Sequence, residues 1–211
     1  VLLNALCSIG VLIRTAEGKL FENSQAANDV LCKEGASYIG TFAELQFRQW
    51  NAWIKAGEVL KSSVDLPHQQ NLVEGDDGYI ELFQEAMAQS CADNLAYILA
   101  LGVWPDTSRV LDLGGGHSSH ACALARAYSH LEIDVWDLPS VAEVAKAQFR
   151  NLPQDTRINF QGCILPHDFP EVDTPFDVVM IVHTLHHLNE DDVEQTLSRV
   201  ADLLSKNGTL I

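Results

Sequence analysis

From residue 109 onward, short apolar runs alternate with longer amphipathic segments, and this alternation restricts the fold more than any other feature of the sequence. Strands that alternate with helices form a parallel sheet covered on both faces. The sequence therefore predicts an α/β, Rossmann-like domain over residues 104–211, whose sheet stops at its fifth strand. The expected strands are 109–113, 131–136, 157–161, 176–182 and 209–211; the expected helices are 118–128, 140–149 (capped by Ser140) and 190–205 (ended by Lys206-Asn207-Gly208).

Residues 1–103 lack this alternation and are expected to form a separate, mostly helical region that joins the α/β domain at Trp104-Pro105-Asp106. Two short runs around a turn predict a small β-hairpin, and a helix followed by a small hairpin is the pattern of a winged helix. The expected helices are 1–9 (ended by Gly10), 24–32 (capped by Ser24), 38–61 and 79–101; the hairpin strands are 11–14 and 19–21, and a loop is expected at 62–77.

The chain is strongly acidic, because 29 Asp and Glu face only 13 Lys and Arg and give a formal net charge of −16. Nucleic-acid binders neutralise phosphates with clustered basic side chains, and both halves of this chain hold more acids than bases. The same sign disfavours anionic membrane surfaces. No apolar run approaches the ~20 residues of a transmembrane helix, and no signal peptide is visible. We therefore expect neither nucleic acid nor membrane as a partner.

The five cysteines are odd in number and far apart, and they include no C-x-x-C pair. This spacing predicts reduced, mostly buried thiols in a cytoplasmic protein. It implies neither a disulfide framework nor a cysteine zinc site.

A run of three glycines follows the first predicted strand of the α/β domain. Ligands of open α/β sheets bind beyond the carboxyl ends of the strands, so the residues there carry the functional information. At this end stand Asp112, Gly114, Gly115 and Gly116. Glycines allow positive φ and let the backbone lie against a ligand, while the next helix presents its N-terminus to it. The motif alone predicts either a nucleotide-type site or a structural tight turn.

Asp137 ends the second predicted strand, 21 residues after Gly116, where a carboxylate can accept both hydroxyls of a ribose. A dinucleotide site predicts the same acid, but Ser119 stands where its fingerprint prefers a third glycine. An acid two residues before the first glycine, as Asp112 is, follows the pattern of S-adenosylmethionine sites instead. The remaining alternative is that Asp112 and Asp137 are solvated carboxylates at strand ends.

Three segments together resemble the class I S-adenosylmethionine-dependent O-methyltransferases: Val110–Gly116, Trp136–Pro139 and Thr184–Asp192. More narrowly, they are similar to the small-molecule family of plant caffeic-acid, acetylserotonin and bacterial polyketide O-methyltransferases. The Asp-Leu-Pro after the second strand is fairly specific to this family, whereas the glycine motif is generic. The resemblance covers nearly the whole chain, since the family also has an N-terminal winged-helix dimerisation region and a helix bearing Phe-x-x-Ala-Met, as at Phe83–Met87.

The resemblance implies an S-adenosylmethionine site. Asp112 and the three glycines would pass along the cofactor, with His117 near it; Asp137 would hold the ribose hydroxyls and Leu138 would pack on the adenine. The family often binds the adenine amino group with an Asp after the third strand, but this chain has Cys163 there. Either Asp168, five residues on, takes that role or the contact is lost. His117 and Ser118 also stand where Thr and Gly are frequent in the family.

Three histidines, His183, His186 and His187, follow the fourth predicted strand. The resemblance implies that His186 is a general base, matching the His of the family's Leu-His-Asp-Trp segment, and that His187 replaces the Asp. A phenol of pKa ~10 is a poor nucleophile until an imidazole of pKa ~6.5 takes its proton. Two alternatives remain: the Leu-His-His-Leu segment is mainly structural in many methyltransferases, and the i, i+3, i+4 spacing could bind zinc, although no HExxH or cysteine partner accompanies it.

Side chains for an acceptor molecule are expected beside these histidines. Phe83 and Met87 lie one helical turn apart and either pack on a planar acceptor or belong to the core. His183 and His187 are expected to contact the acceptor too. His120, His130 and His167 are expected on loops or on a helix surface.

The expected function is transfer of a methyl group from S-adenosylmethionine to a hydroxyl of an aromatic or polyketide-like small molecule, without a metal, in a homodimer formed through the N-terminal region. The alternatives are a non-catalytic scaffold or small-molecule sensor with the same fold and, less favoured, an NAD-dependent dehydrogenase. The family's winged helix should begin before Val1, and its sheet should continue after Ile211. We therefore expect an interior fragment, in which the carboxylates that orient His186 in the family come after residue 211.

Overall fold

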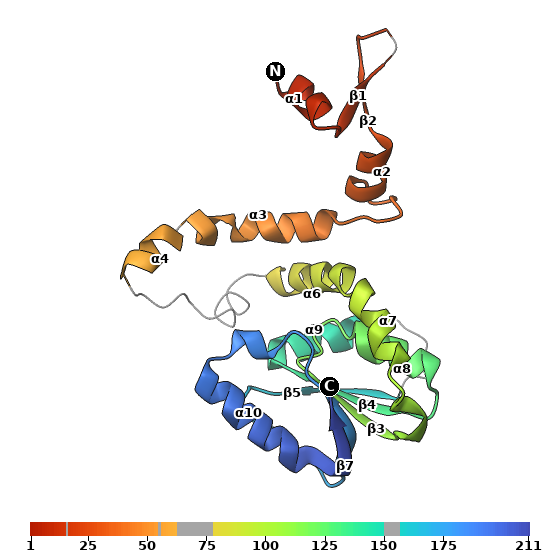
Figure 1. The fold of residues 1–211 in the computed structure, drawn as a ribbon, viewed down its shortest axis with the longest axis vertical. Coiled ribbons are helices and arrows are strands. Elements are labelled where there is room, and N and C mark those ends of the chain that lie inside the picture. Colours follow the sequence, from red (N-terminus) through yellow and green to blue (C-terminus); the bar gives the residue numbers. More distant parts are fainter. Residues whose placement is uncertain (16, 55, 63–77, 150–156) are drawn as a thin grey trace. The chain divides into compact units, whose positions relative to one another are not determined.

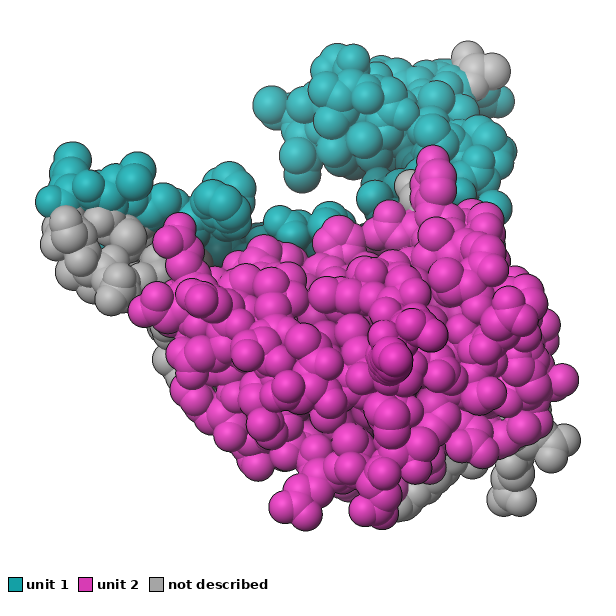
Figure 2. All heavy atoms as spheres, turned by 60° about the horizontal axis from the view of Figure 1, so that its bottom comes forward, with its two compact units in different colours: residues 1–63 teal, residues 64–211 magenta. Residues whose placement is uncertain are grey.

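The computed structural model describes residues 1–15, 17–54, 56–62, 78–149 and 157–211. It divides the chain into two compact units, residues 1–63 (unit 1) and residues 64–211 (unit 2), coloured separately in Figure 2. The division differs from the predicted boundary at 103–104. The predicted loop at 62–77 lies, from residue 63 on, outside the described residues. None of the described helices is long and apolar enough to cross a membrane.

Unit 1 consists of helices and one antiparallel hairpin, as predicted. The first helix ends before Gly10, whose φ of +79° only glycine adopts without strain. The Oγ of Ser24 accepts a hydrogen bond from the N–H of Ala27 at 3.1 Å and so caps the second helix, as predicted. The elements are α1 (Leu2–Ser8), β1 (Leu12–Arg14), β2 (Phe21–Asn23), α2 (Gln25–Leu31), α3 (Gly40–Ile54) and α4 (Ala56–Ser62) (Figure 1).

One of the two long helices predicted in the first half, 79–101, is divided in the structure. The stretch 38–61 contains α3 and α4, which flank residue 55, a position outside the described residues. The stretch 79–101 contains α6 (Tyr79–Ser90) and α7 (Ala92–Ala100), which meet at Cys91. Here α6 packs against α9 (Pro139–Phe149), whereas α7 packs against α8 (Ser119–Ala127). The two parts of the predicted helix therefore have different packing partners.

The helices α6 and α7 belong to unit 2 because their side chains are anchored in it. The buried Gln84 of α6 donates from Nε2 to the carbonyl of Val141 in α9 at 3.1 Å. A short 3-10 helix, η1 (Trp104–Asp106), follows α7. Its fully buried Trp104 donates a hydrogen bond from the indole N–H to the carbonyl of Ile98 in α7 at 2.7 Å. The predicted joint at Trp104 is therefore part of the core of unit 2.

The sheet of unit 2 is five-stranded and entirely parallel, in the order β5-β4-β3-β6-β7, as the alternating pattern predicts. One prediction at its edge was wrong, because Lys206–Gly208 lie within β7 and do not end a helix. The irregular register between β6 and β7 accommodates these residues. The strands are β3 (Arg109–Leu113), β4 (Glu132–Asp137), β5 (Ile158–Gly162), β6 (Phe176–Met180) and β7 (Leu204–Leu210).

Helices cover the sheet on both faces (Figure 1). Side chains of α7 and α8 join one apolar cluster, whereas Val200 and Leu203 of α10 (Glu190–Leu203) join the other. The strand β3 contributes Val110 to the first cluster and Leu111 to the second, because successive side chains point to opposite faces. The helix α9 begins at Pro139, so Ser140 is not its cap as predicted, since proline suits the first helical position.

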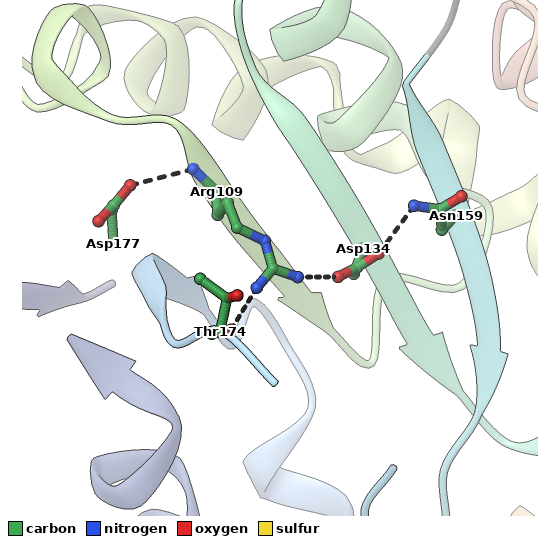
Figure 3. A network of polar contacts seen from close by, with 5 residues as sticks. All are labelled: Arg109, Asp134, Asn159, Thr174 and Asp177. Carbon is green, nitrogen blue, oxygen red and sulfur yellow. Dashed lines mark hydrogen bonds and ion pairs between the residues drawn. The ribbon is translucent and has the colours of Figure 1, made fainter. Parts of the chain in front are cut away.

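A polar network ties four strands together near their amino ends (Figure 3). A guanidinium nitrogen of Arg109 lies 3.0 Å from Oδ2 of Asp134, and the other donates to the carbonyl of Thr174. The second oxygen of Asp134 accepts from the amide of Asn159 at 3.1 Å. Asp177 accepts from the backbone N–H of Arg109 at 3.0 Å. The network therefore links β5, β4, β3 and β6 at the edge opposite their carboxyl ends.

We expect Asp134→Ala to lower the free energy of unfolding by about 1–3 kcal/mol, because it leaves a half-buried guanidinium and an amide without their shared carboxylate. Urea unfolding followed by circular dichroism measures the change. Asp173→Ala, at an exposed position before β6, is the control and should stay within about 0.5 kcal/mol of the parent. Equal stability of the two variants would contradict a stabilising role for the network.

Candidate functional site

The carboxyl ends of β3 and β6 meet at the point where the strand order reverses, which is where open α/β sheets bind ligands. Gly114, directly after β3, lies against Thr184 of the loop after β6. A Cβ on Gly114 would come within 2.2 Å of Oγ1 of Thr184, and φ of Gly114 is +77°. Thr184 donates from Oγ1 to the carbonyl of Leu113 at 3.2 Å. Only glycine therefore fits at 114, and the two loops are held together there.

The next two glycines have different surroundings. A Cβ on Gly115 would lie 2.8 Å from the carboxyl carbon of Asp112, so its backbone covers that side chain. A Cβ on Gly116 would meet only Oδ2 of Asp137, at 3.8 Å, among the described atoms. The turn is therefore closely packed at Gly114 and Gly115 and open at Gly116, on the side where Asp137 lies.

The side chain of Asp137 is hydrogen-bonded to the backbone of the glycine turn. Its two oxygens accept hydrogen bonds from the N–H of Gly116 at 2.8 Å and of Leu138 at 2.7 Å. Burial raises the pKa of Asp137, while these two bonds lower it. Each carboxylate oxygen can accept more than one hydrogen bond, so Asp137 keeps acceptor capacity for a ligand.

Asp112 is the most buried carboxyl group of the site. Its side chain is 1% exposed, and its Oδ2 has no hydrogen-bond partner among the described residues. Burial and, to a smaller extent, the charge of Asp137 raise the pKa of Asp112, the N–H of Ala121 in α8 lowers it, and together they bring it to about 7. Asp112 therefore changes charge near neutral pH, and it is not the solvated carboxylate of the alternative interpretation.

Two histidines lie at the start of α8. The Nδ1 of His117 accepts from the N–H of Ser119 at 3.1 Å, and burial followed by the charge of His120 lowers the pKa of His117 to about 4. His120 was expected on a loop or a helix surface, but it is 5% exposed, in a helix that packs against α7. Its Nε2 has no partner in the described part of the chain. Burial, then the charge of His183, lowers the pKa of His120.

The loop after β6 presents the three predicted histidines, all exposed. The rings of His183 and His186 are 6.3 Å apart, and those of His186 and His187 are 3.9 Å apart. The last two belong to a 3-10 turn, η2 (Leu185–His187). Partial burial of its ring, then the charge of His186, lowers the pKa of His187 to about 4. At neutral pH His187 is therefore uncharged.

Asn94 of α7 also belongs to this part of the site, and no sequence motif pointed to it. Its Nδ2 lies 2.8 Å from Nε2 of His183. The two residues are 89 positions apart, so only packing of α7 beside the loop brings them together. The described residues contain no group of three or more His, Cys, Asp or Glu that could hold a metal ion.

The two candidates for the adenine contact have different surroundings. Cys163 is 2% exposed within an apolar cluster, and burial, then the charges of Asp168 and Asp137, raises the pKa of its thiol to about 12. Asp168 is exposed, and its backbone pairs with that of Ile164, which returns it to the end of β5. Of the two, Asp168 is the one available to a ligand.

Phe83 and Met87 lie on α6 within unit 2 and are half-buried. The ring of Phe83 stacks on Tyr79, with centroids 6.2 Å apart. Neither side chain belongs to the two apolar clusters that cover the sheet.

We expect Asp112→Asn to stabilise the chain increasingly as the pH rises. The raised pKa of Asp112 means that its contribution to stability is fully present below its ordinary pKa of 3.8 and is lost as the pH rises through about 7. The gain of the Asn variant over the parent should grow between about pH 4 and about pH 7, to about 2–4 kcal/mol, and then level off. Urea unfolding at each pH measures it, with the exposed Asp173→Asn as control; parallel curves for Asp112→Asn and the parent would contradict the buried charge.

Known proteins are similar to this chain along its whole length. A family model described as an O-methyltransferase domain matches residues 64–211. The mitomycin biosynthesis 6-O-methyltransferase of Streptomyces lavendulae is 28% identical over 219 residues, covering 100% of this chain and 61% of that protein. The tetracenomycin polyketide synthesis 8-O-methyl transferase of Streptomyces glaucescens is 27% identical over 215 residues, covering 99% and 62%. The chain thus spans about three fifths of the length of these relatives.

Among solved structures, human N-acetylserotonin methyltransferase in complex with SAM aligns with a TM-score of 0.81 at 18% identity, covering 99% of this chain and 62% of that one. This likeness shows the fold. The family match covers residues 64–211, the same range as unit 2, which contains the sheet and the glycine turn. The chain therefore belongs to the O-methyltransferase family that this domain defines.

Proposed function

We propose that this chain binds S-adenosylmethionine and takes part in transferring its methyl group to a hydroxyl of an aromatic or polyketide-like small molecule. One observation carries the proposal: the glycine turn, bordered by Asp137, lies at the strand end directly beside the loop that bears His186. A methyl donor on the turn and an acceptor at the histidine loop would be neighbours. The tetracenomycin and mitomycin relatives support the class of acceptor by their names.

The charge of the site favours S-adenosylmethionine over a dinucleotide. S-adenosylmethionine combines a ribose with a positively charged sulfonium and ammonium, whereas NAD brings an anionic pyrophosphate. Asp112, whose Oδ2 has no hydrogen-bond partner among the described residues, and Asp137 beside the turn attract the cationic groups of S-adenosylmethionine and repel the pyrophosphate of NAD. The open side of Gly116 lets backbone approach the ligand, and Asp137 retains acceptor capacity for ribose hydroxyls. Leu138 and Asp168 are proposed at the adenine.

His186 is proposed as the general base. Bound S-adenosylmethionine supplies an electrophilic methyl group, so the chain itself needs to position the acceptor and remove the proton of its hydroxyl. An exposed imidazole can take that proton on its unprotonated ring nitrogen. Phe83 and Met87 are proposed to pack on the acceptor, with His183 and His187 at its polar edge. Holding the acceptor oxygen in line with the methyl group provides the remaining acceleration.

Unit 1 is proposed to be a winged-helix region through which two chains dimerise. Its helix, hairpin and helix succession supports the first part of this proposal. The exposed apolar side chains of α3 support the second, and they are Phe47, Trp50, Trp53 and Ile54. We also propose that residues 1–103 include a lid over the substrate. The cytoplasmic location expected from the number and spacing of the five cysteines stays a prediction.

We expect the chain to bind S-adenosylmethionine and S-adenosylhomocysteine but not NAD, measured by isothermal calorimetry. Asp137→Ala should weaken S-adenosylhomocysteine binding by about 10–100-fold, because charge-assisted hydrogen bonds to the ribose are lost. The exposed Asp173→Ala should bind like the parent. Binding of NAD instead, or of neither ligand, would sink the proposal.

We expect His186→Ala to lower methyl transfer by at least ~100-fold while S-adenosylhomocysteine affinity is kept, since the base acts only on the acceptor proton. The measurement is transfer of labelled methyl to a panel of phenols and polyketides. His167→Ala, at an exposed position after β5, is the matched control. Unchanged turnover of His186→Ala would mean that positioning alone drives the reaction.

A further inference from the structure

The hydrogen bond between Asn94 and His183 connects α7 with the histidine loop. The two side-chain nitrogens, Nδ2 of Asn94 and Nε2 of His183, are 2.8 Å apart. Asn94 lies in a helix that precedes the sheet, and His183 follows β6. This bond is a direct polar link between the helical side of unit 2 and the loop that carries the proposed base.

The backbone at His183 is held in an unusual conformation. Its φ is +57°, in the left-handed region that residues with a Cβ rarely adopt. Such strain persists only where surrounding contacts enforce it, and it is frequent at functional sites. The side chain is exposed, so packing alone does little to orient its ring. The bond to Asn94 is the polar contact that does so.

The chemistry of this pair selects one form of the imidazole. A side-chain amide nitrogen only donates hydrogen bonds, so the ring nitrogen that faces it must accept. Nε2 of His183 is then unprotonated, and the neutral ring carries its proton on Nδ1. In a charged ring Nε2 would also carry a proton, so two hydrogen-bond donors, Nε2 of His183 and Nδ2 of Asn94, would face each other.

We propose that Asn94 is a positioning residue, which holds His183 as the neutral Nδ1–H tautomer so that the ring offers a hydrogen-bond donor to an acceptor oxygen beside His186. The rings of His183 and His186 are 6.3 Å apart, close enough for both to contact one acceptor molecule. The two histidines then have different roles: His183 donates a hydrogen bond to the acceptor oxygen, and His186 receives the proton of the acceptor hydroxyl. This inference rests on the proposed function for its consequence, but the tautomer itself is a property of the free chain.

The tautomer is measured by two-dimensional ¹H–¹⁵N spectra of the imidazole nitrogens of the ¹⁵N-labelled chain, with His183→Gln identifying the signals of His183. In the parent we expect Nε2 unprotonated and Nδ1 protonated at neutral pH. In Asn94→Asp the carboxylate can only accept, so the proton should move to Nε2. Tyr97→Ala, which removes an exposed side chain from the same helix, is the matched control and should leave the signals of His183 unchanged.

The kinetic consequence is a rise in KM for the acceptor in Asn94→Ala, by about 3–10-fold, with S-adenosylhomocysteine affinity unchanged, because one neutral hydrogen bond to the acceptor is lost. A protonated Nε2 in the parent would overturn the assignment even if a variant failed to fold. A changed tautomer with an unchanged KM would overturn the positioning role. Failure of the parent to bind S-adenosylhomocysteine would instead count against the proposed function. The spectra would still show which nitrogen of His183 carries the proton.

Discussion

The close approach of two loops at the centre of the sheet is the constraint on which the rest of the site depends. Gly114 leaves β3 directly against Thr184 of the loop after β6, at a distance that admits no Cβ. Because β3 and β6 are adjacent parallel strands, their carboxyl ends open at the same edge. The glycine turn and the histidine loop therefore share one edge of unit 2 and lie against each other there.

The titratable groups of this edge separate into two kinds. The carboxyl groups of Asp112 and Asp137 lie under and beside the glycine turn, and burial raises the pKa of both. The imidazoles begin at His117 and continue through His120 to the loop after β6, and burial keeps several of them neutral. An acidic side suits a cationic methyl donor, and a neutral imidazole side suits removal of a proton from a hydroxyl. The arrangement supports the proposed chemistry.

Local pattern predicted the strands well and the helix ends less well. Four strands, β3 to β6, were expected within two residues of their ends, because their alternation with helical segments is visible in the sequence, whereas β7 begins five residues before the strand expected at 209–211. The helix predicted at 79–101 is interrupted at Cys91, since its apolar periodicity continues while its packing partner changes from α9 to α8. The same cause moved the boundary between the units to residue 63, because α6 and α7 pack with the sheet that follows them.

The sequence by itself determined the α/β architecture, the glycine turn, and the positions of Asp137 and His186 at strand ends, because each follows from residues close together in the chain. The tertiary structure alone decided which groups are buried and which distant groups meet. The burial of Asp112, the burial of His120 and the pairing of Asn94 with His183 are of this kind. Solvent exclusion and contacts between remote segments arise only when helices pack on a sheet, and no local motif encodes them.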